Sequence, residues 1–300
     1  MNTLKALRTF VALAHEGSIA AAAEKVSLTQ AAVSQQMIAL ESELRRSLFD
    51  RSGRITRLNA AGRALLPQAE RMLRLNDEMH GMFGDSEGLT GSYRLGAVVS
   101  ACGQLAHATG DLRRQHPRID IKLVAAKSQD LAIQVEAGEL DAAVVVKPAT
   151  DPAPPLAWTT LYEEPLIVLA SARSHHDDAL AALETEPFLR FDRRERTGEL
   201  VMQTLRRHDF AVKEFLELNS IAAIADLVRQ GYGVSLLPQL ARGRWAEDKM
   251  LRVLPLPGAT SYRELGLLHR ANDQGPIIDA VVACLSDRTT APASGNHGLD

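Results

Sequence analysis

Apolar residues recur at helical spacing near the start of the chain and predict an amphipathic first helix. The residues of this stripe are Leu4, Leu7, Phe10, Val11 and Ala14. Ser18 is placed to cap a second, alanine-rich helix, and Thr29 to cap a third helix that runs from Gln30 to about Leu44. Two short helices joined by residues 26–28 form a helix-turn-helix.

The third predicted helix has two contrasting faces. Its buried face is predicted to contain Val33, Met37, Leu40 and Leu44. Its opposite face has amide or short side chains at Gln30, Ala31, Ser34 and Gln35. Glutamine can pair with adenine in the major groove of DNA, and serine can use a donor or an acceptor edge. A solvated face on a small helical bundle explains the same residues, so this helix alone leaves both interpretations open.

A basic segment follows this helix directly. Two short β-prone pieces flank Ser52-Gly53 and predict a hairpin, or wing, with arginines at Arg51, Arg54 and Arg57. Arginines on a wing can reach phosphates or the narrow minor groove. A helix-turn-helix followed by a basic wing favours DNA binding more strongly than either part does.

Asn59 is placed to cap a long helix from Ala60 to about Phe83. Steps of four and three residues along it form a seam of Leu65, Ala69, Met72, Asn76, Met79 and Phe83. Such a seam is typical of a helix that pairs with another helix, where a polar residue such as Asn76 can fix the register. A core helix is the competing interpretation, but the flanks are too polar for burial on all sides. Pairing of two copies would suit a dyad-symmetric DNA site.

Beyond a linker at residues 85–91, strands are predicted to alternate with helices. The strands are Tyr93–Val98, Ile119–Val124, Ala142–Val146, Leu166–Ala170, Phe188–Phe191, Val212–Leu218, Val234–Leu237 and Leu265–His269. The helices are Gly103–Gln115, Gln129–Ala137, Gly198–Arg207, Ile221–Gln230 and Ile277–Leu285. This alternation predicts parallel sheets with helices on both faces. A proline-rich stretch at residues 147–155 interrupts it and predicts a crossover between two lobes.

Composition and charge refine this picture. The 300 residues, 46% hydrophobic and 24% charged, indicate a globular chain of two or three domains. With no apolar run of roughly 18 residues and no leader-like N-terminus, a cytoplasmic protein without a membrane partner is expected. The net charge is -3, yet residues 1–75 contain eleven Lys and Arg against six Asp and Glu. This basic N-terminal segment would suit docking on a polyanion such as DNA, although a charge imbalance of this size also arises by chance.

The chain resembles the LysR-type family of transcriptional regulators. In the first 60 residues the resemblance is carried by Phe10, Gly17-Ser18, Ala22-Ala23-Glu24, segment 30–36, Leu40-Glu41, Leu44, Leu48-Phe49, Arg51, Arg54, Leu58 and Ala61-Gly62. Later it is carried by segments 91–96, 138–143, 227–234 and Leu237-Pro238. The resemblance implies a sequence-specific DNA-binding regulator, controlled by a small-molecule effector.

The resemblance also implies an α/β architecture made of several parts. These are a winged helix-turn-helix at 1–58, a linker helix and hinge at 59–90, a two-lobed effector domain like a periplasmic binding protein at 91–288, and a disordered tail at 289–300. Within the effector domain, lobe 1 is expected at about 91–160 and 267–288, and lobe 2 at about 161–266. Members are usually dimers of dimers, and RNA polymerase is a further candidate partner.

Carried over by position, the DNA contacts are expected at Thr29, Gln30, Ala31, Ser34, Gln35, Arg51 and Arg54. Many members have proline at the position of Ala31 and a basic residue at that of Gln35. Loss of that charge should weaken phosphate or guanine contacts and shift the base preference towards adenine. Affinity should then depend more on the wing and on dimer geometry than on this helix.

Ligands of two-lobed α/β domains bind between the lobes, near the carboxyl ends of the strands. By position, the resemblance places the effector site at Ser100, Ala101, Ser128, Lys147, Pro148, Thr197, Gly198 and Asn219. Helix N-termini near Gly103, Gln129 and Gly198 would direct backbone N–H groups at an anion, which favours a small carboxylate metabolite. Each of these residues alone is also explained as a helix cap or a turn.

Other features are interpreted without a chemical role. The run 175–178, His-His-Asp-Asp, has no partner pair at ligand spacing, so a solvated loop is expected rather than a metal site. Cys102 and Cys284 are far apart, which predicts no disulfide and an idle Cys102 rather than a redox sensor. No metal or cofactor is expected.

Three other functions fit parts of the chain. A solute-binding protein would share the two-lobed fold, but the winged N-terminus and the lack of a leader-like pattern argue against it. Catalysis has little support, since the sequence has no nucleophile elbow, P-loop or dinucleotide fingerprint. A regulator that needs no effector remains compatible with the sequence.

Overall fold

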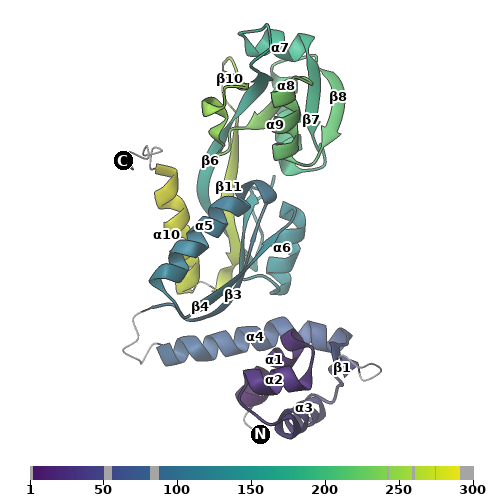
Figure 1. Ribbon diagram of the computed structural model, residues 1–300, viewed down its shortest axis with the longest axis vertical. Helices are drawn as coiled ribbons and strands as arrows, with labels where there is room; N and C mark the ends of the chain where they lie inside the picture. Colours follow the sequence, from purple (N-terminus) through teal and green to yellow (C-terminus); the bar gives the residue numbers. More distant parts are fainter. Residues whose placement is uncertain are drawn as a thin grey trace, which may run out of the picture. The chain divides into compact units, whose positions relative to one another are not determined.

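The computed structural model describes residues 3–50, 56–81, 88–241, 243–258, 261–273 and 275–290. Contacts divide the chain into two compact units. The first is residues 1–92 with the short segments 118–120 and 137–139, and the second is the remainder (Figure 1). Within the described residues, no helix is long and apolar enough to cross a membrane.

The first unit contains four helices and a short hairpin among its described residues. In chain order these are α1 (Thr3–Glu16), α2 (Ile19–Lys25), α3 (Gln30–Leu44), β1 (Phe49–Asp50), β2 (Arg57–Leu58) and α4 (Ala60–Gly81). Strands β1 and β2 pair antiparallel, with Phe49 opposite Leu58. They form the base of the predicted wing, whose tip at residues 51–55 lies outside the described residues.

The helix starts in this unit follow the predicted capping pattern. The Ser18 hydroxyl accepts a hydrogen bond from the backbone N–H of Ala21 at 3.1 Å, and the Asn59 side chain accepts one from Gly62 at 3.0 Å. The buried core unites all four helices and the hairpin through Leu7, Phe10, Leu13, Ala22, Met37, Leu40, Leu48, Phe49 and Ala69. The prediction of Leu44 as buried is wrong. That residue is 41% exposed, because α3 ends there and Arg45 turns away with a left-handed backbone at φ 52.

The residues of the predicted seam on α4 have two different environments. Leu65 and Ala69 pack into the core of their own unit. Met72 and Met79 are 48% and 55% exposed, and Leu75, which the predicted seam did not include, is 51% exposed. The second half of α4 therefore has an apolar face that its own unit does not cover. Phe83 lies outside the described residues.

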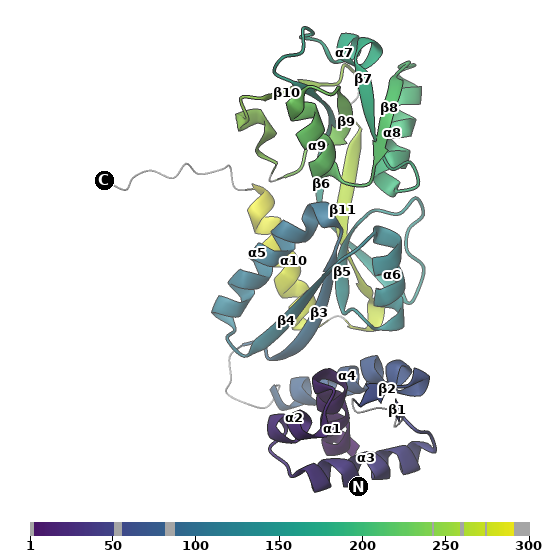
Figure 2. The same ribbon diagram turned by 45° about the vertical axis from the view of Figure 1, so that its right-hand side comes forward.

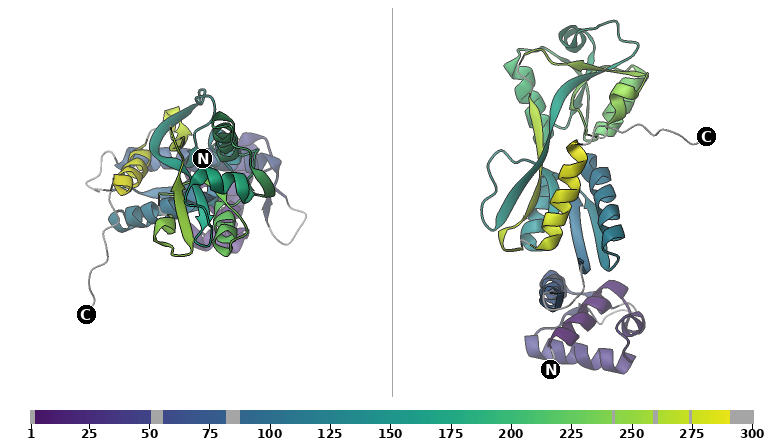
Figure 3. Two further views of the ribbon diagram at one scale, coloured as in Figure 1. Left: turned by 90° about the horizontal axis from the view of Figure 1, so that it is seen from above. Right: turned by 90° about the vertical axis from the view of Figure 1, so that its left-hand side faces the viewer.

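The second unit is organised around one mixed sheet with the strand order β10-β6-β11-β5-β3-β4, and β9 also pairs with β6. Lobe 1 contains β3 (Gly91–Ala97), α5 (Val99–Gln115), β4 (Ile119–Ala125), α6 (Ser128–Ala137), β5 (Ala142–Val146), η2 (Ala271–Asp273) and α10 (Pro276–Thr290). Helices α5 and α10 lie side by side on one face of its sheet, and α6 covers the other (Figure 2 and Figure 3). Since α10 continues to Thr290, residues 289 and 290 are helical rather than part of the expected tail. Residues 291–300 lie outside the described residues.

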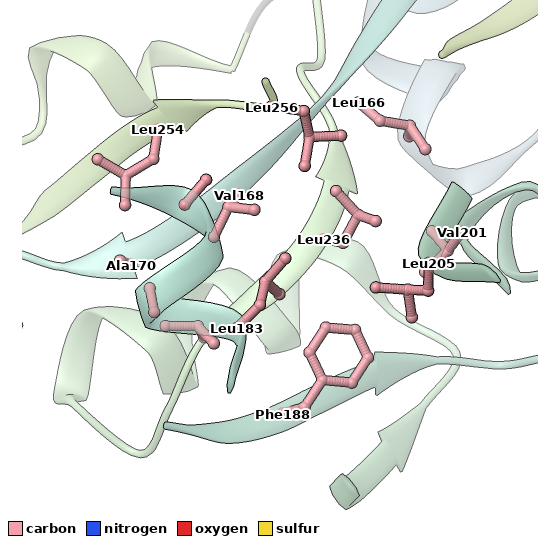
Figure 4. Packing of buried hydrophobic residues seen from close by; sticks show 13 residues of the cluster. Leu166, Val168, Ala170, Leu183, Phe188, Val201, Leu205, Leu236, Leu254 and Leu256 are labelled. Atoms are coloured by element: carbon pink, nitrogen blue, oxygen red, sulfur yellow. The ribbon is translucent and has the colours of Figure 1, made fainter. Parts of the chain in front are cut away.

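Lobe 2 is an α/β unit with its own hydrophobic core. Its elements are α7 (Ala179–Thr185), β7 (Pro187–Phe191), α8 (Arg196–Arg207), β8 (Lys213–Leu218), α9 (Ile221–Gln230), β9 (Ser235–Pro238), η1 (Arg244–Glu247) and β10 (Leu251–Pro255). Figure 4 shows this core, where Phe188 of β7 lies among Val168, Leu183, Leu205 and Leu236.

Two long strands join the lobes. Strand β6 (Leu156–Ser171) pairs along its first half with β11 (Tyr262–Arg270), and along its second half with β9 and β10. Because β11 returns from lobe 2 beside the outgoing β6, the two run antiparallel. The prediction of parallel sheets is therefore confirmed only in part: β3 with β5 and β7 with β8 are parallel pairs, whereas β6 and β11 pair antiparallel with their neighbours. The passage between lobes, expected in residues 147–155, is made by β6 and β11.

Candidate functional site

The exposed face of α3 forms the first candidate site. Thr29 begins the helix, and its hydroxyl accepts a hydrogen bond from the backbone N–H of Ala32 at 3.2 Å. Gln30, Ala31 and Gln35 are exposed beyond it, and Ser34 is half-buried. The predicted groove-facing residues are thus on one accessible face. Thr29 contributes by fixing the helix start.

Hydrogen bonds on both sides hold α3 in place. The Thr9 hydroxyl of α1, which is buried, donates to the Gln36 side-chain oxygen at 2.6 Å. Further along, the Glu41 carboxylate accepts the backbone N–H of Leu48 at 2.7 Å. A helix fixed in this way presents its outer face with little freedom, which suits reading of a rigid duplex.

The positive charge around α3 lies beside the helix rather than on it. No Lys or Arg occurs from Gln30 to Leu44, whereas Arg45 and Arg46 follow at its end and are exposed. The predicted wing residues Arg51 and Arg54 lie outside the described residues.

A cavity of about 350 Å³ between the lobes of the second unit forms the second candidate site. The first residues of α5, α6, α8 and α9 line it. The hydroxyl and amide groups that line the cavity come from Ser100, Ser128, Thr197, Asn219 and Ser220. The apolar part of its lining is formed by Val98, Val146, Phe191, Ile221 and Leu240. Four helices of ten or more residues therefore begin at one small volume, and each brings the positive end of its dipole.

Two of these helix starts have no side-chain cap. Neither Val98, which precedes α5, nor Glu195, which precedes α8, caps its helix with a side-chain hydrogen bond. By contrast, Ser220 caps α9 by accepting the backbone N–H of Ala223 at 3.3 Å. The Ser128 hydroxyl accepts the backbone N–H of Val146 at 3.3 Å, which leaves its own proton free to donate. The starts of α5 and α8 can therefore offer backbone N–H groups to an anion.

Polar contacts connect the two lobes across this cavity. Lys127 of lobe 1 forms an ion pair with Glu195 of lobe 2 at 2.6 Å, and this hydrogen bond raises the pKa of the Lys127 ammonium. Arg196 donates through Nε to the backbone oxygen of Lys147 at 3.1 Å. A second cavity of about 680 Å³ shares Lys127, Ser128, Val146, Glu195 and Arg196 with the first, so these residues lie between the two.

A buried ion pair closes one side of the first cavity. Arg263 of β11 lies against Glu164 of β6, and their side chains are 2% and 3% exposed. Arg263 Nε donates to the Glu164 carboxylate at 2.9 Å, whose other oxygen accepts the backbone N–H of Ala241 at 3.0 Å. Arg263 was not among the predicted site residues and lay outside the predicted strand Leu265–His269, since a single arginine in a sequence gives no sign of burial until its neighbours are known.

The predicted effector residues separate into three groups. Ser100, Ser128, Thr197 and Asn219 line the first cavity. Pro148, together with Ser128, lines the second cavity. The remaining three residues line neither of these two cavities, namely Ala101, Lys147 and Gly198.

Each of those three residues has a structural role instead. Ala101 is buried in α5 at 2% exposure. The Lys147 ammonium pairs with Glu264 at 2.9 Å. A Cβ at Gly198 would lie 2.0 Å from the Asp192 carbonyl oxygen, so the glycine lets α8 begin directly against that backbone. Lys127, Glu195 and Arg196 line the cavity and were not predicted.

The His-Asp run is part of the fold of lobe 2. Asp178 caps α7 by accepting the backbone N–H of Ala181 at 3.0 Å, and Asp177 pairs with Arg252. His176 Nε2 lies 2.9 Å from the Thr185 hydroxyl. No cluster of three or more metal-ligating side chains occurs among the described residues.

Comparison with known proteins decides the family. The profile "Bacterial regulatory helix-turn-helix protein, lysR family" matches residues 4–63, and "LysR substrate binding domain" matches residues 86–290. The chain belongs to the LysR family of bacterial transcriptional regulators. It is therefore a sequence-specific DNA-binding regulator with an effector-binding domain.

Individual LysR-family relatives match nearly the whole chain. A "Probable RuBisCO transcriptional regulator" of Nostoc sp. is 28% identical, covering 90% of this chain and 83% of the relative. The "Uncharacterized HTH-type transcriptional regulator YusT" of Bacillus subtilis is 28% identical, covering 88% of each. Among solved structures, an OxyR mutant of Corynebacterium glutamicum has a TM-score of 0.69 at 25% identity, covering 96% of this chain and 92% of the other.

Proposed function

We propose that this LysR-family regulator binds a small anionic metabolite in the 350 Å³ cavity, and that the bound metabolite changes its affinity for DNA. The observation that carries this proposal is the convergence of four helix N-termini, two of them without a side-chain cap. The cations at the cavity already have carboxylate partners, since Lys127 pairs with Glu195, Arg196 with Glu199 and Arg263 with Glu164. The preference for an anion therefore rests on the helix dipoles and backbone N–H groups.

Four side chains are proposed to contact the effector directly: Ser100, Ser128, Thr197 and Asn219. Pro148 would form the wall of the neighbouring cavity, and Ala101, Lys147 and Gly198 would position the elements around the site. The cavity volume of about 350 Å³ is at the lower end of the range of roughly 300–1,000 Å³ for pockets that hold small ligands, which suits a small metabolite.

Removal of the serine hydroxyls is expected to abolish effector binding while DNA binding survives. A panel of small carboxylates, aromatic acids and amino acids is screened by thermal shift with the wild-type protein. The compound that raises the melting temperature is then tested on Ser100→Ala and Ser128→Ala, and on Ser174→Ala, which lies outside the cavity, as the matched control. An unchanged shift in both cavity variants would remove these serines from the site, and a panel without any binder would favour a regulator that needs no effector.

DNA reading is proposed to use Thr29, Gln30, Ala31, Ser34 and Gln35 of the first unit, with Arg51 and Arg54 on the wing contacting the backbone. Homo-oligomers, including a dimer of dimers, are supported by the uncovered apolar residues Met72, Leu75 and Met79 of α4. A dimer would bind a dyad-symmetric promoter site, and RNA polymerase is a candidate partner there.

The remaining assignments follow from this role. We place the DNA-binding domain at 1–58, the linker at 59–90 and the effector domain from residue 91 to the end of α10 at Thr290, in a cytoplasmic protein. No catalytic step, metal or cofactor is assigned to the chain.

A further inference from the structure

An exposed isoleucine lies in the middle of the outer face of α3. Ile38 is 57% exposed, whereas Val33, Met37 and Leu40 of the same helix are buried. At helical spacing it shares a face with Ala31, seven residues earlier, and with Gln35, three residues earlier. The same helix has no Lys or Arg from Gln30 to Leu44. Its outer face thus has an apolar centre.

We infer that Ile38 reads the 5-methyl group of thymine in the major groove. This inference rests on the DNA-reading role proposed for α3. Base edges in that groove present hydrogen-bond donors and acceptors, and the thymine methyl is the one apolar group among them. An aliphatic side chain that enters the groove gains free energy from desolvation only where it meets such a group. The face that contains Ile38 is continuous with the face that contains Gln30, Ala31 and Gln35.

The geometry of a helix places Ile38 on a different base pair from Gln30. Eight residues correspond to about 12 Å along the helix axis at about 1.5 Å per residue, which is roughly three to four base pairs at about 3.4 Å each. A helix that lies along the groove can therefore read adenine near its N-terminus with Gln30 and thymine further along with Ile38. The preferred half-site would contain both bases at that separation.

Deoxyuridine tests the inference because it differs from thymidine only by the missing methyl group. Preferred duplexes are first recovered with the full-length protein from a random library, and each thymine is then replaced singly. For the wild type, an affinity loss of about fourfold, as expected for one buried methyl group, should occur at one or two positions in each half-site. Ile38→Ala should bind the thymine and uracil duplexes equally at one of these positions, and Ile38→Val should retain part of the difference.

The matched control is Ile133→Ala, because Ile133 is 58% exposed but lies on α6 of the second unit. This variant should keep the full deoxyuridine effect. The inference would be overturned if no replacement changed the affinity of the wild type, or if Ile38→Ala kept the affinity loss at every position. Either result would leave DNA reading by α3 intact. Failure to recover any preferred duplex would overturn both.

Discussion

An Arg263→Met variant is expected to lose about 3 kcal/mol of unfolding free energy from the second unit, because it leaves a buried carboxylate without its cation. Arg263 and Glu164 are both almost fully buried, and the Glu164 carboxylate also accepts the backbone N–H of Ala241. Glu164→Gln/Arg263→Met should recover most of the loss, since the amide keeps an acceptor for Ala241 and removes the uncompensated charge.

Urea denaturation followed by tryptophan fluorescence measures this change. The two tryptophans of the chain, Trp158 and Trp245, both belong to the second unit, so their emission reports on that unit alone. Arg244→Met is the matched control, since Arg244 is 79% exposed and its ion pair should contribute less than about 1 kcal/mol. Equal stability of Arg263→Met and the control would show that the buried pair does not support the fold. A double variant as weak as the single one would show that the loss comes from packing.

Gly62→Ala is expected to destabilise the first unit by about 2 kcal/mol and to reduce DNA binding. A Cβ at Gly62 would lie 2.2 Å from the carbonyl oxygen of Leu48 and 2.8 Å from a methyl of Leu58. The same Leu48 oxygen accepts the backbone N–H of Asn59 at 3.0 Å, so a shift of α4 would also disturb its cap. The start of α4 cannot approach Leu48 and Leu58 as closely once a methyl group is present.

Far-UV circular dichroism and limited proteolysis should show earlier loss of the first unit in this variant, while tryptophan emission of the second unit is unchanged. Gly110→Ala provides the control, because Gly110 lies within α5 and a Cβ added there would meet no atom within 4 Å. That change should be neutral or stabilising by about 0.5–1 kcal/mol, as for other helical glycines. Wild-type stability of Gly62→Ala would contradict the close contact between α4 and Leu48.

Local signals in the sequence predicted the first unit well because each of its helices is specified by nearby residues. The caps at Ser18, Thr29 and Asn59 lie within three residues of the groups that they bind, so spacing alone was sufficient to identify them. The polar part of the outer face of α3 was likewise visible in the sequence. Ile38 was not predicted there, since an isoleucine next to the buried stripe of a helix looks like a core residue until its exposure is known.

Long-range pairing explains what the sequence did not reveal. The first half of β6 pairs with β11, about one hundred residues later, and its mixed composition gives no alternating pattern of its own. The partnership of Arg263 with Glu164 depends on the same pairing. The family resemblance gave Ser100, Ser128, Thr197 and Asn219 by position, and all four line the first cavity, whereas the charged residues between them required the tertiary structure.

Sequence discrimination by the full-length protein tests the central claim most directly. Competition binding at about 150 mM salt compares a duplex from the DNA upstream of its own gene with a scrambled duplex of equal composition. We expect a preference of about a thousandfold or more for the wild type, and a much smaller preference for Gln30→Ala/Ser34→Ala, with affinity for the scrambled duplex unchanged. Equal affinity of the wild type for both duplexes, or a preference that the double variant keeps in full, would contradict the claim.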